Sequence, residues 1–585
     1  MSFKWVYRDR PDVEAIAALS RELGLDRLAA TVCVNRGLTR VEQVRNFLNP
    51  SLNQLSHPFT ILDLEKAVDR VLDSQMKAEP EFIRVFTDYD VDGTSGAALL
   101  TWFFRDLKFR FDVTQPDRFK DGYGLNVGAV ERAHEDGVKI LMTVDCGITN
   151  FDAAEKAREL GIELIIIDHH QIDPVRGLPP ALAVVDPQRA DDPSGLKQLC
   201  GCALAFYLCM GIRIKARDRG FFSANGLAEP NLKSLLDLVV LATAADMVPL
   251  VGDNRVLVTH GLEVLRETQK PGLRAMMETA GIEVKKVSPM SLGFTLGPRI
   301  NASGRMGSAE TAYLALTTRD PDEAMRLARE LESINQQRAT LQNQIWDEVR
   351  ETVQKKIEAG KFQHAVVVAS ENWHEGVVGI VASKVTDHFK RPAIVLAVRE
   401  DGIAKGSVRS YGGYNVLEAL HLSKHFLKGY GGHKYAAGLS LSPDDVEAFA
   451  DHYDAEVAKL ESSRSKGELH LEGEILPHEM TPKALEELER LAPFGPGNPE
   501  PLFSLVTAVD SQSVLKGRHL KLKLSKTPPI EGIWFNAAER LEYTQLVEKS
   551  AQRKNLCVFA GIPELNRFMG RTTPTLRIKD ATEAQ

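Results

Sequence analysis

The chain has 585 residues, of which 43% are hydrophobic and 26% are charged, and its formal net charge at pH 7 is −8. This composition excludes a disordered, collagenous or fibrous protein, and the length predicts about three to four domains. The net charge excludes a uniformly basic coat for nucleic acid. It allows a local basic groove, because binding follows the distribution of charge rather than the total.

The six cysteines are scattered along the chain and form no disulfide framework. Cys200 and Cys202 are close in sequence, but the second pair that would complete a zinc site is missing. A reduced, cytoplasmic protein is the simplest interpretation. Charged residues precede the first apolar run, and the apolar stretch Leu235–Ala245 is too short for a membrane span. We therefore expect neither a signal peptide nor a membrane-spanning segment.

Short apolar runs alternate with amphipathic stretches in the first half of the chain. The runs are rich in Ile, Val or Phe and cover Phe82–Phe86, Ile140–Val144, Glu163–Ile167 and Leu182–Val185. Such nearly continuous apolar character is typical of strands that are buried on both faces of a parallel sheet. Helices are expected between the strands, for example over Asn126–Asp136 and Phe151–Leu160. The pattern predicts a doubly wound α/β domain.

Acidic residues follow each of these strands. In chain order they are Asp88, Asp90 and Asp92; Asp145; Asp168, which precedes His169 and His170; and Asp186. A later apolar helix, Leu232–Ala245, ends at Asp246. Because the carboxyl ends of parallel strands lie along one edge of a sheet, we expect these side chains to converge in one crevice.

An aspartate after a strand is usually a helix cap or a turn residue. Consecutive strands that all end in acid are difficult to explain by capping alone, because uncompensated carboxylates at one edge repel each other. Divalent cations remove that repulsion. Asp and His ligands without cysteine favour Mn²⁺ or Mg²⁺, and zinc is the weaker alternative.

These residues resemble the motifs of a known superfamily. The chain is similar to the DHH phosphoesterase superfamily in Asp88–Thr94, Val144–Gly147, Asp168–His170 and Ala244–Pro249, in this order. Within the superfamily it most resembles the RecJ exonuclease family, through Gly297–Arg305, Trp373–Ile380, Gly431–Gly438 and Pro493–Pro501. Together these segments extend over nearly the whole chain.

The resemblance implies an α/β, multidomain architecture. Its parts are an N-terminal helical segment, a doubly wound parallel-sheet DHH domain, a long connector helix, an α/β DHH-associated domain that binds nucleic acid, and a C-terminal β-barrel (OB-like) domain. The expected ranges are 1–55, 56–315, 316–358, 359–462 and 463–585. Apolar residues at helical spacing in Asp322–Gln354 by themselves predict a helix of about 50 Å, which could be a plain packed helix. The resemblance implies that this helix joins the two domains.

The function that the resemblance implies is a metal-dependent 5′→3′ exonuclease. It would hydrolyse single-stranded DNA to mononucleotides with two Mn²⁺ or Mg²⁺ ions, in DNA recombination and repair. One alternative is a DHH-type phosphodiesterase acting on short oligonucleotides or cyclic dinucleotides, although the additional OB-like domain argues against so small a substrate. The other is a non-catalytic single-stranded-DNA-binding scaffold, against which the complete ligand set argues. The implied partners are a single-strand-binding protein and a repair helicase, and we expect a monomer.

The resemblance also assigns roles at the metal site. The metal ligands would be Asp88, Asp90, Asp92, Asp145, His169 and Asp246, with Asp145 bridging the two ions. An alternative role for Asp88 is to bind through water or to orient the other ligands. His170 would face the scissile phosphate, and Asp168 would fix an imidazole tautomer. Asp186 has no match in the family pattern and is interpreted as structural.

Phosphate or DNA contacts are implied in four parts of the chain. Arg118 lies in a glycine-containing segment, and Arg299, Asn301, Ser303 and Arg305 are expected in a glycine-flanked loop. Ser407, Arg409, Gly432 and His433 belong to small-residue segments that would bind DNA phosphates, and the first three are candidates for the terminal 5′-phosphate. In the predicted barrel, Lys521 and Lys523 alternate with leucines, which indicates a strand with one polar face. That face would hold single-stranded DNA, and the alternative is a merely solvated face.

Overall fold

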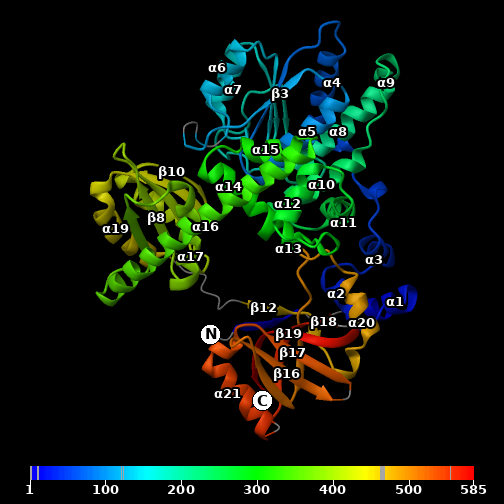
Figure 1. Cartoon of the computed structure of the whole chain (residues 1–585), viewed down its shortest axis with the longest axis vertical. Helices are drawn as coiled ribbons and strands as arrows, with labels where there is room; N and C mark the ends of the chain where they lie inside the picture. Colours follow the sequence, from blue (N-terminus) through cyan, green and yellow to red (C-terminus); the bar gives the residue numbers. More distant parts are fainter. Residues whose placement is uncertain are drawn as a thin grey trace. The chain divides into compact units, whose positions relative to one another are not determined.

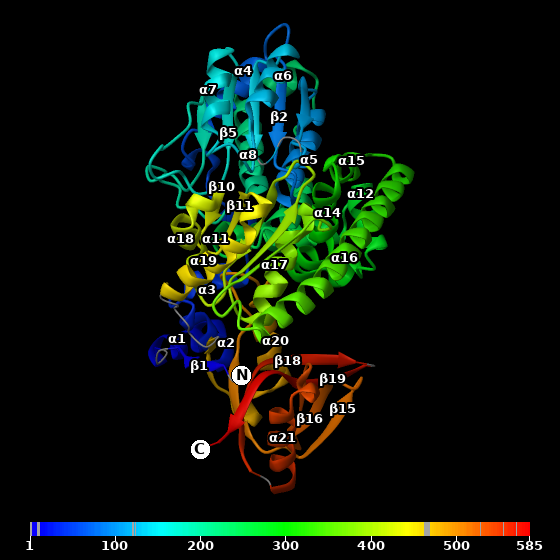
Figure 2. The ribbon, with the colours of Figure 1, turned by 90° about the vertical axis from the view of Figure 1, so that its left-hand side faces the viewer.

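Figures 1 and 2 show the chain as a computed structural model that describes residues 3–8, 12–119, 122, 124–460, 468–526, 528–553, 555–568 and 570–584. The chain forms two compact units. The larger comprises His57–Asp246 and Gly261–Arg464, and the smaller comprises Met1–Ser56, Met247–His260 and Ser465–Gln585. The expected domain boundary at 462/463 lies outside the described residues, and the other expected limits remain a proposal.

A five-stranded parallel sheet forms the centre of the first part of the larger unit. Its strand order is β3-β2-β4-β5-β6. The strands are β2 (Ile83–Thr87), β3 (Phe111–Thr114), β4 (Ile140–Val144), β5 (Glu163–Ile167) and β6 (Ala183–Val185). The apolar runs thus form a parallel sheet, as predicted. β3 was not predicted, because this edge strand is short and all of its residues are only half-buried.

Helices cover both faces of this sheet. They are α4 (Leu64–Gln75), α5 (Val91–Asp106), α6 (Val127–Glu135), α7 (Phe151–Glu159), α8 (Gly201–Asp218), α9 (Phe221–Ala224) and α10 (Leu236–Ala245). On one face, α6 and α7 share a core with Leu141 and Ile166. On the other face, α5 packs against α8 and α10. Gly96 of α5 allows the close approach there, since a Cβ atom at this position would lie 2.7 Å from Val144 Cγ1.

Short helices follow and lead to the connector. They are α11 (Gly252–Arg266), α12 (Pro271–Thr279), α13 (Pro289–Ser291), the π-helix η5 (Leu292–Leu296), α14 (Gly297–Met306) and α15 (Glu310–Thr317). The expected loop over Gly297–Arg305 is wrong, because these residues form α14. Its glycines serve close packing: a Cβ atom on Gly304 would lie 3.0 Å from Tyr89 O.

The connector is the helix α16 (Pro321–Glu358), which has 38 residues and is therefore about 57 Å long. It leads into a mixed sheet of order β10-β11-β9-β8-β7. The elements of this domain are β7 (Val366–Ser370), α17 (Glu375–Phe389), β8 (Ala393–Val398), β9 (Ala404–Arg409), α18 (Val416–Leu422), β10 (Leu427–His433), β11 (Ala436–Leu441) and α19 (Val446–Lys459). The predicted connector and α/β domain are both present.

The smaller unit contains a seven-stranded sheet of order β13-β14-β18-β19-β17-β16-β15. Its strands are β13 (Gly473–Glu474), β14 (Phe503–Thr507), β15 (Ser511–Leu515), β16 (His519–Lys526), β17 (Pro529–Trp534), β18 (Cys557–Phe568) and β19 (Arg571–Glu583). The helices α20 (Pro482–Glu489) and α21 (Leu541–Arg553) accompany it, and β12 (Glu468–Leu471) pairs in parallel with β1 (Lys4–Tyr7).

The N-terminal helices of this unit are α1 (Val13–Leu23), α2 (Arg27–Asn35) and α3 (Val41–Leu48). They share one hydrophobic core with the seven-stranded sheet: Leu28 and Val44 belong to the same buried cluster as Phe503 and Leu522. The first and last parts of the sequence are therefore one packed body. Among the described residues, no helix combines the length and the apolar character that a bilayer span requires.

Candidate metal centre and phosphate site

The predicted acidic residues converge at the point where the parallel sheet reverses its strand order. Asp88 and Asp90 directly follow β2, and Asp145 follows the neighbouring strand β4. Between these two strands lies the switch point, because β3 is on one side of β2 and β4 is on the other. Open α/β sheets bind ligands in the crevice at this place. The backbone of Asp145 has φ 63°, a left-handed conformation that turns the chain sharply after β4.

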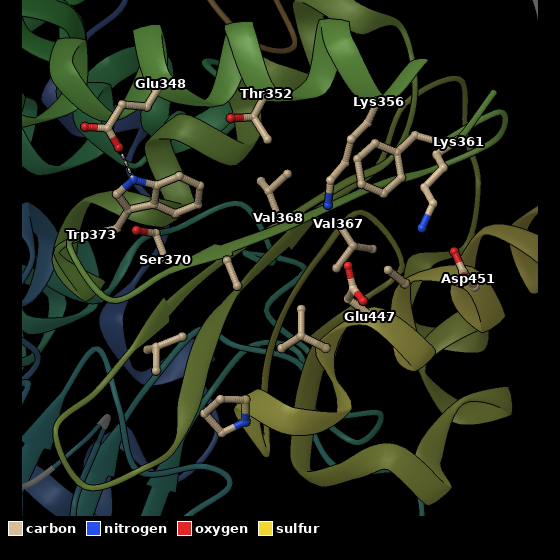
Figure 3. A pocket seen from close by; sticks show the side chains of 16 residues that line it. Glu348, Thr352, Lys356, Lys361, Val367, Val368, Ser370, Trp373, Glu447 and Asp451 are labelled. Carbon is tan, nitrogen blue, oxygen red and sulfur yellow. Dashed lines mark hydrogen bonds between the residues drawn. The ribbon is translucent and has the colours of Figure 1, made fainter. Parts of the chain in front are cut away.

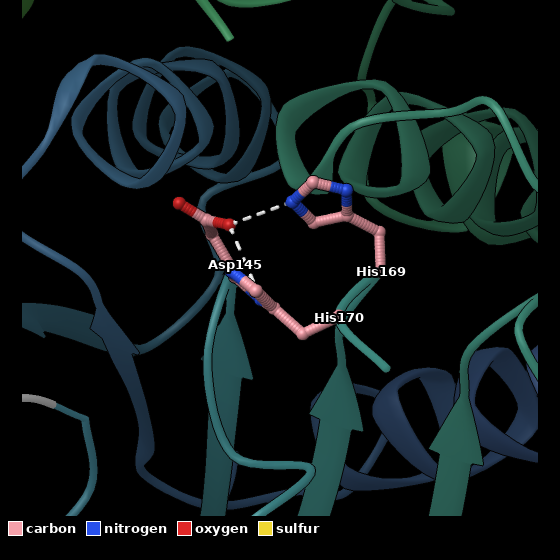
Figure 4. A group of neighbouring side chains, drawn as sticks. All are labelled: Asp145, His169 and His170. Carbon is pink, nitrogen blue, oxygen red and sulfur yellow. Dashed lines mark hydrogen bonds and ion pairs between the residues drawn. The ribbon is translucent and has the colours of Figure 1, made fainter. Parts of the chain in front are cut away.

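Asp145 is the centre of the cluster, and Figure 4 shows both histidines beside it. Its Oδ1 lies 3.1 Å from His169 Nε2 and 3.9 Å from His170 Nδ1. His169 Nε2 also lies 3.6 Å from Asp92 Oδ2 and 3.8 Å from Asp246 Oδ2. Four separate segments therefore contribute side chains to one site.

Three overlapping groups have ligand atoms close enough to hold a metal ion. They are Asp145, His169 and His170; Asp92, His169 and Asp246; and Asp88, Asp90 and Asp145. Within each group, all the ligand atoms lie within 4.8 Å of one another. Asp145 and His169 each belong to two groups, as expected where two ions share ligands. The structure thus brings all six predicted metal ligands together.

Asp92 is held by the N-terminus of α8. Its carboxylate accepts hydrogen bonds from the backbone N–H of Gly201 at 2.6 Å and of Cys202 at 2.9 Å. The partial positive charge of a helix N-terminus attracts carboxylate oxygens. Gly201 also supports Asp145, since a Cβ atom on Gly201 would lie 2.7 Å from Asp145 Cβ. Gly201 was not among the predicted site residues, because the sequence around it, Cys200–Cys202, indicates only half of a zinc site.

The carboxylates of the cluster repel each other electrostatically. Burial, followed by the charge of Asp90, raises the pKa of Asp88 well above its ordinary value. Burial, followed by the charges of Asp92 and Asp90, likewise raises the pKa of Asp145. Burial and the same two charges raise the pKa of Asp246 to about 8. Asp88 Oδ1 is buried and has no hydrogen-bond partner among the described residues. Oxygen donors that repel each other, one of them unsatisfied, fit hard divalent cations.

His170 and Asp168 form a close pair. Asp168 Oδ1 lies 2.7 Å from His170 Nδ1, while Asp168 Oδ2 accepts the backbone N–H of Ile148 at 3.0 Å. Burial would lower the pKa of His170, but the hydrogen bond and the charge of Asp168 raise it to about 9. The pKa of Asp168 is lowered despite its burial, by the hydrogen bond to His170. The imidazole is therefore fixed in orientation and biased toward its cationic form.

Asp186 interacts electrostatically with this pair, and it belongs to none of the three possible ligand groups. Its Oδ1 accepts the backbone N–H of Gln188 at 2.8 Å, and its buried Oδ2 has no hydrogen-bond partner in the described part of the chain. Burial raises the pKa of Asp186 to about 8.

Three guanidinium groups gather beside the acidic cluster. The Arg118 guanidinium lies 5.4 Å from the centre of the Tyr89 ring, and Tyr89 is the residue between Asp88 and Asp90. Burial, followed by the charge of Arg118, lowers the pKa of Arg305 to about 10. The same two causes lower the pKa of Arg409. Within the part of the chain that the structure describes, none of the three forms an ion pair with a carboxylate. This arrangement is suited to binding an anion.

The remaining predicted phosphate contacts on α14 have different environments. Asn301 faces the metal site, where its Oδ1 accepts the backbone N–H of Val91 at 3.0 Å. Ser303 is buried and donates to Ile300 O at 2.7 Å. Arg299 pairs with Glu332 at 2.6 Å, so its charge is already neutralised. Of the four predicted contacts on α14, Asn301 and Arg305 are thus the two that are placed toward the site.

The DHH-associated domain contributes the other side of the arginine cluster. Arg409 is the last residue of β9 and Ser407 lies two residues before it. Both contact α17: a Cβ atom on Gly379 would lie 3.0 Å from Ser407 Oγ and 3.1 Å from Arg409 Nη2. Gly432 has φ 141° and lies across from Ala437, which in turn pairs with β9. Gly432 is therefore about 10 Å from β9, at two strand spacings. His433 is exposed at the end of β10.

The lysines of the seven-stranded sheet lie on its polar face, as predicted. Leu520, Leu522 and Leu524 are buried, and the residues between them are not. Lys521 forms an ion pair with Glu531 of the adjacent β17 at 2.8 Å. Lys523 forms no ion pair among the described residues. The basic character of this face therefore rests more on Lys523 than on Lys521.

A separate cavity of about 430 Å³ lies between β7, the C-terminal part of α16 and α19 (Figure 3). Trp373 Nε1 donates to Glu348 at 2.8 Å at one end. In Figure 3, Lys356 lies on the α16 wall of this cavity and Glu447 lies on the opposite wall. None of the predicted site residues lines this cavity, so it is distinct from the metal centre and from the arginine cluster.

Known families match three parts of the chain. The model of the DHH family, N-terminal domain, matches residues 82–243; that of the DHHA1 domain matches 360–459; and that of the RecJ OB domain matches 471–580. The single-stranded-DNA-specific exonuclease RecJ of Escherichia coli strain K12 is 35% identical over 541 residues, which are 90% of this chain and 92% of that protein. The chain belongs to the RecJ family.

Other RecJ proteins support the assignment over the whole length. RecJ of Bacillus subtilis strain 168 is 33% identical over 583 residues, which are 98% of this chain and 70% of that protein. The crystal structure of RecJ from Thermus thermophilus in complex with Mn²⁺ matches with a TM-score of 0.82 at 28% identity, covering 100% of this chain and 80% of that one. The same protein has been crystallised with Mg²⁺, and that structure matches with a TM-score of 0.75 at 27% identity.

Membership of the RecJ family confirms the fold expected from the sequence: a DHH domain, a DHH-associated domain and a C-terminal OB domain. The site agrees with the metals named for the Thermus RecJ, because its donors are carboxylates and imidazoles and no thiol is among these described ligand groups.

Proposed function

We propose that this chain is a metal-dependent exonuclease that degrades single-stranded DNA from the 5′ end to mononucleotides, in recombination and repair. The observation that carries the proposal is the juxtaposition of an acidic cluster around Asp145 with a cluster of three arginines, linked through Tyr89. A phosphodiester hydrolase needs both parts: one for the reaction and one to hold the charged substrate.

The metal ligands in this proposal are Asp88, Asp90, Asp92, Asp145, His169 and Asp246, and the ions are Mn²⁺ or Mg²⁺. Bound ions of this kind supply an activated water and neutralise charge that develops on the phosphate. Asp145 is the proposed bridging ligand, because it belongs to two of the three possible ligand groups. The α8 N-terminus holds the Asp92 carboxylate in place, which preorganises the site before an ion arrives.

His170 is proposed to contact the scissile phosphate. Asp168 orients the ring through Nδ1 and holds a proton there. A cationic imidazole beside Asp145 attracts a phosphate oxygen. The hydrogen bond that the imidazolium donates to this oxygen is stronger than one from a neutral ring. Asp168 is thus a positioning residue. It accepts a buried hydrogen bond from Ile148 N, which links the segment after β5 to the segment after β4.

The direction of digestion is proposed to follow from the arginine cluster. Arg118, Arg305 and Arg409, with Ser407, would bind the terminal 5′-phosphate. Because Arg118 stacks on the ring of Tyr89, which lies between two proposed metal ligands, the terminal phosphate would lie next to the metal centre. A strand anchored in this way presents its next phosphodiester bond for cleavage, so that one nucleotide leaves at a time.

The remaining parts of the proposal concern the surroundings of the enzyme. The OB domain would bind the single strand through Lys523 and its neighbours. A single-strand-binding protein and a repair helicase are proposed as partners, and a monomer as the working form. A reducing, cytoplasmic environment is proposed because all six cysteines are buried free thiols.

The test is a nuclease assay on a long 5′-labelled single strand, its duplex form and a dinucleotide, with and without Mn²⁺. We expect release of labelled mononucleotide from the single strand, and only with the metal. The Asp145→Ala variant should lack the activity while still binding DNA. Preferential hydrolysis of the dinucleotide would instead indicate a small-substrate phosphodiesterase. Binding without hydrolysis by the wild-type protein would indicate a scaffold.

A further inference from the structure

The edge strand of the DHH-associated domain borders the 430 Å³ cavity of Figure 3. β7 is at the end of the strand order β10-β11-β9-β8-β7 and pairs in parallel with β8. Val366 N donates to Pro392 O, which precedes β8, at 2.9 Å. A parallel strand bonds to one neighbour through every second residue, so Val368 faces β8 as well. Val367 and Ala369 therefore turn their backbone N–H and C=O groups away from the sheet.

The outward backbone groups of β7 have no partner along most of the strand. Before the strand begins, Ala365 N donates to Asp454 Oδ1 of α19 at 2.7 Å. Among the described residues, no hydrogen bond reaches the outward groups of Val367 and Ala369. Val367 is only 2% exposed, so bulk water solvates these groups poorly. Buried backbone groups are nearly always paired, and an unpaired strand edge is a template for a further strand.

The two walls beside this edge carry opposite charges. Lys356 lies on the α16 wall and Glu447 on the opposite wall, which α19 forms (Figure 3). Lys361 and Asp451 also line the cavity. Within the described part of the chain, none of these four side chains forms an ion pair. Lys356 Nζ instead lies 5.3 Å from the centre of the Phe362 ring. Opposed, unpaired charges on two walls complement an occupant that carries both signs.

The geometry of a strand specifies the chemistry of this occupant. In a strand added to β7, successive side chains would point to opposite faces, and therefore alternately to the α16 wall and the α19 wall. An acidic residue on one side would meet Lys356, and a basic residue next to it in sequence would meet Glu447. The cavity is otherwise lined by apolar side chains such as Val398, Val446 and Ala450, which suit β-branched neighbours of the charged pair.

We propose that the free edge of β7 is a docking site for an extended segment of another protein, which adds to the sheet as a further strand and carries an acidic residue next to a basic one. Backbone hydrogen bonds to Val367 and Ala369 supply affinity, and the charges of Lys356 and Glu447 select the segment. None of the proposed metal ligands or phosphate contacts lines the cavity. The inference therefore does not depend on the proposed nuclease reaction.

The test measures binding of a fluorescent peptide, acetyl-Thr-Val-Glu-Lys-Val-Thr-amide, to the full chain by fluorescence polarisation. Wild-type protein should bind it saturably. Lys356→Gln and Glu447→Gln should each weaken binding by about two- to fivefold, the effect of losing a partly exposed ion pair. Lys355→Gln is the matched control, because Lys355 pairs with Glu351 and does not line the cavity. Lys356→Glu should reverse the preference, so that a peptide with Lys-Lys in place of Glu-Lys binds more tightly.

Methylation of the peptide backbone separates strand addition from simple charge attraction. N-methyl groups on alternate residues block the N–H groups that face β7 in one register and those that face away in the other. The first peptide should lose about tenfold or more in affinity, and the second should bind as the parent does. Hydrogen exchange at Val367 and Ala369 should slow when the parent peptide binds. Absence of saturable binding, equal loss with both methylated peptides, or equal weakening by Lys355→Gln and Lys356→Gln would overturn the inference.

Discussion

Asp92 and Gly201 are 109 residues apart in sequence, yet a hydrogen bond of 2.6 Å joins Gly201 N to Asp92 Oδ2. The same glycine packs against the Cα and Cβ of Asp145. Gly201 therefore sets the separation between two proposed metal ligands, and the N-terminus of α8 packs directly against the metal centre.

Gly201→Ala should displace Asp145 and reduce nuclease activity by about 100-fold, since small misplacements of catalytic groups have effects of this size. Mn²⁺ should also bind more weakly, as measured by calorimetry. Gly307→Ala is the control, because a Cβ atom there meets no atom within 4 Å. Full activity of Gly201→Ala would show that the contact between residue 201 and Asp145 tolerates a side chain.

Asp145→Ala should abolish hydrolysis, because it removes the ligand that two of the possible ligand groups share. DNA binding should persist, since the arginine cluster and the OB domain remain. Rates on a labelled single strand and gel-shift affinities provide the measurement. Activity within about tenfold of wild type would remove Asp145 from the proposed ligands.

Arg409→Ala should weaken the preference for a 5′-phosphate over a 5′-hydroxyl end. A charge-assisted hydrogen bond to phosphate contributes roughly 1.5–3 kcal/mol, or about ten- to a hundredfold in relative rate. Arg350→Ala, which removes an exposed arginine that pairs with Asp347, should leave the preference unchanged. If Arg409→Ala cuts both ends in the wild-type ratio, end recognition depends on other residues.

The metal-free protein should lose stability as the pH rises from about 6 to about 8. The pKa of Asp246 is raised to about 8 and that of His170 to about 9, so the folded protein binds more protons than the unfolded chain in this range. Its free energy of unfolding therefore falls with increasing pH. Mn²⁺ replaces the protons on the carboxylates, so the Mn²⁺-induced increase in Tm should be larger at the higher pH. Equal increases at both pH values would contradict the assignment.

Lys523→Ser should make the salt slope of binding to a long single strand shallower by about 0.7. Lys521→Ser should have a smaller effect, because Lys521 is already paired with Glu531. Hydrolysis of short substrates should not change in either variant. Equal slopes for both variants and the wild type would show that this face of β16 is only solvated.

The sequence predicted best where one local signal decides the structure. The apolar runs Ile140–Val144 and Glu163–Ile167 coincide with β4 and β5, because strands buried on both faces have no polar interruptions. The acidic cluster was expected because aspartates follow successive strands of one parallel sheet, whose carboxyl ends lie along one edge. Predictions from the sequence were wrong or incomplete where contacts between residues distant in sequence determine the structure. Gly304 has the local signature of a loop but packs on Tyr89 within a helix, and Glu531 neutralises Lys521 from another strand.

The shared core of the N-terminal helices and the seven-stranded sheet affects the order in which the parts of the chain can fold during synthesis. Leu28 and Val44 are synthesised before the larger unit, but their partners Phe503 and Leu522 are synthesised only after it. Until then the early helices expose apolar surface, and the larger unit can fold before them. Removal of the N-terminal helices should therefore expose the core of the OB domain and favour aggregation, although none of the proposed metal ligands is lost.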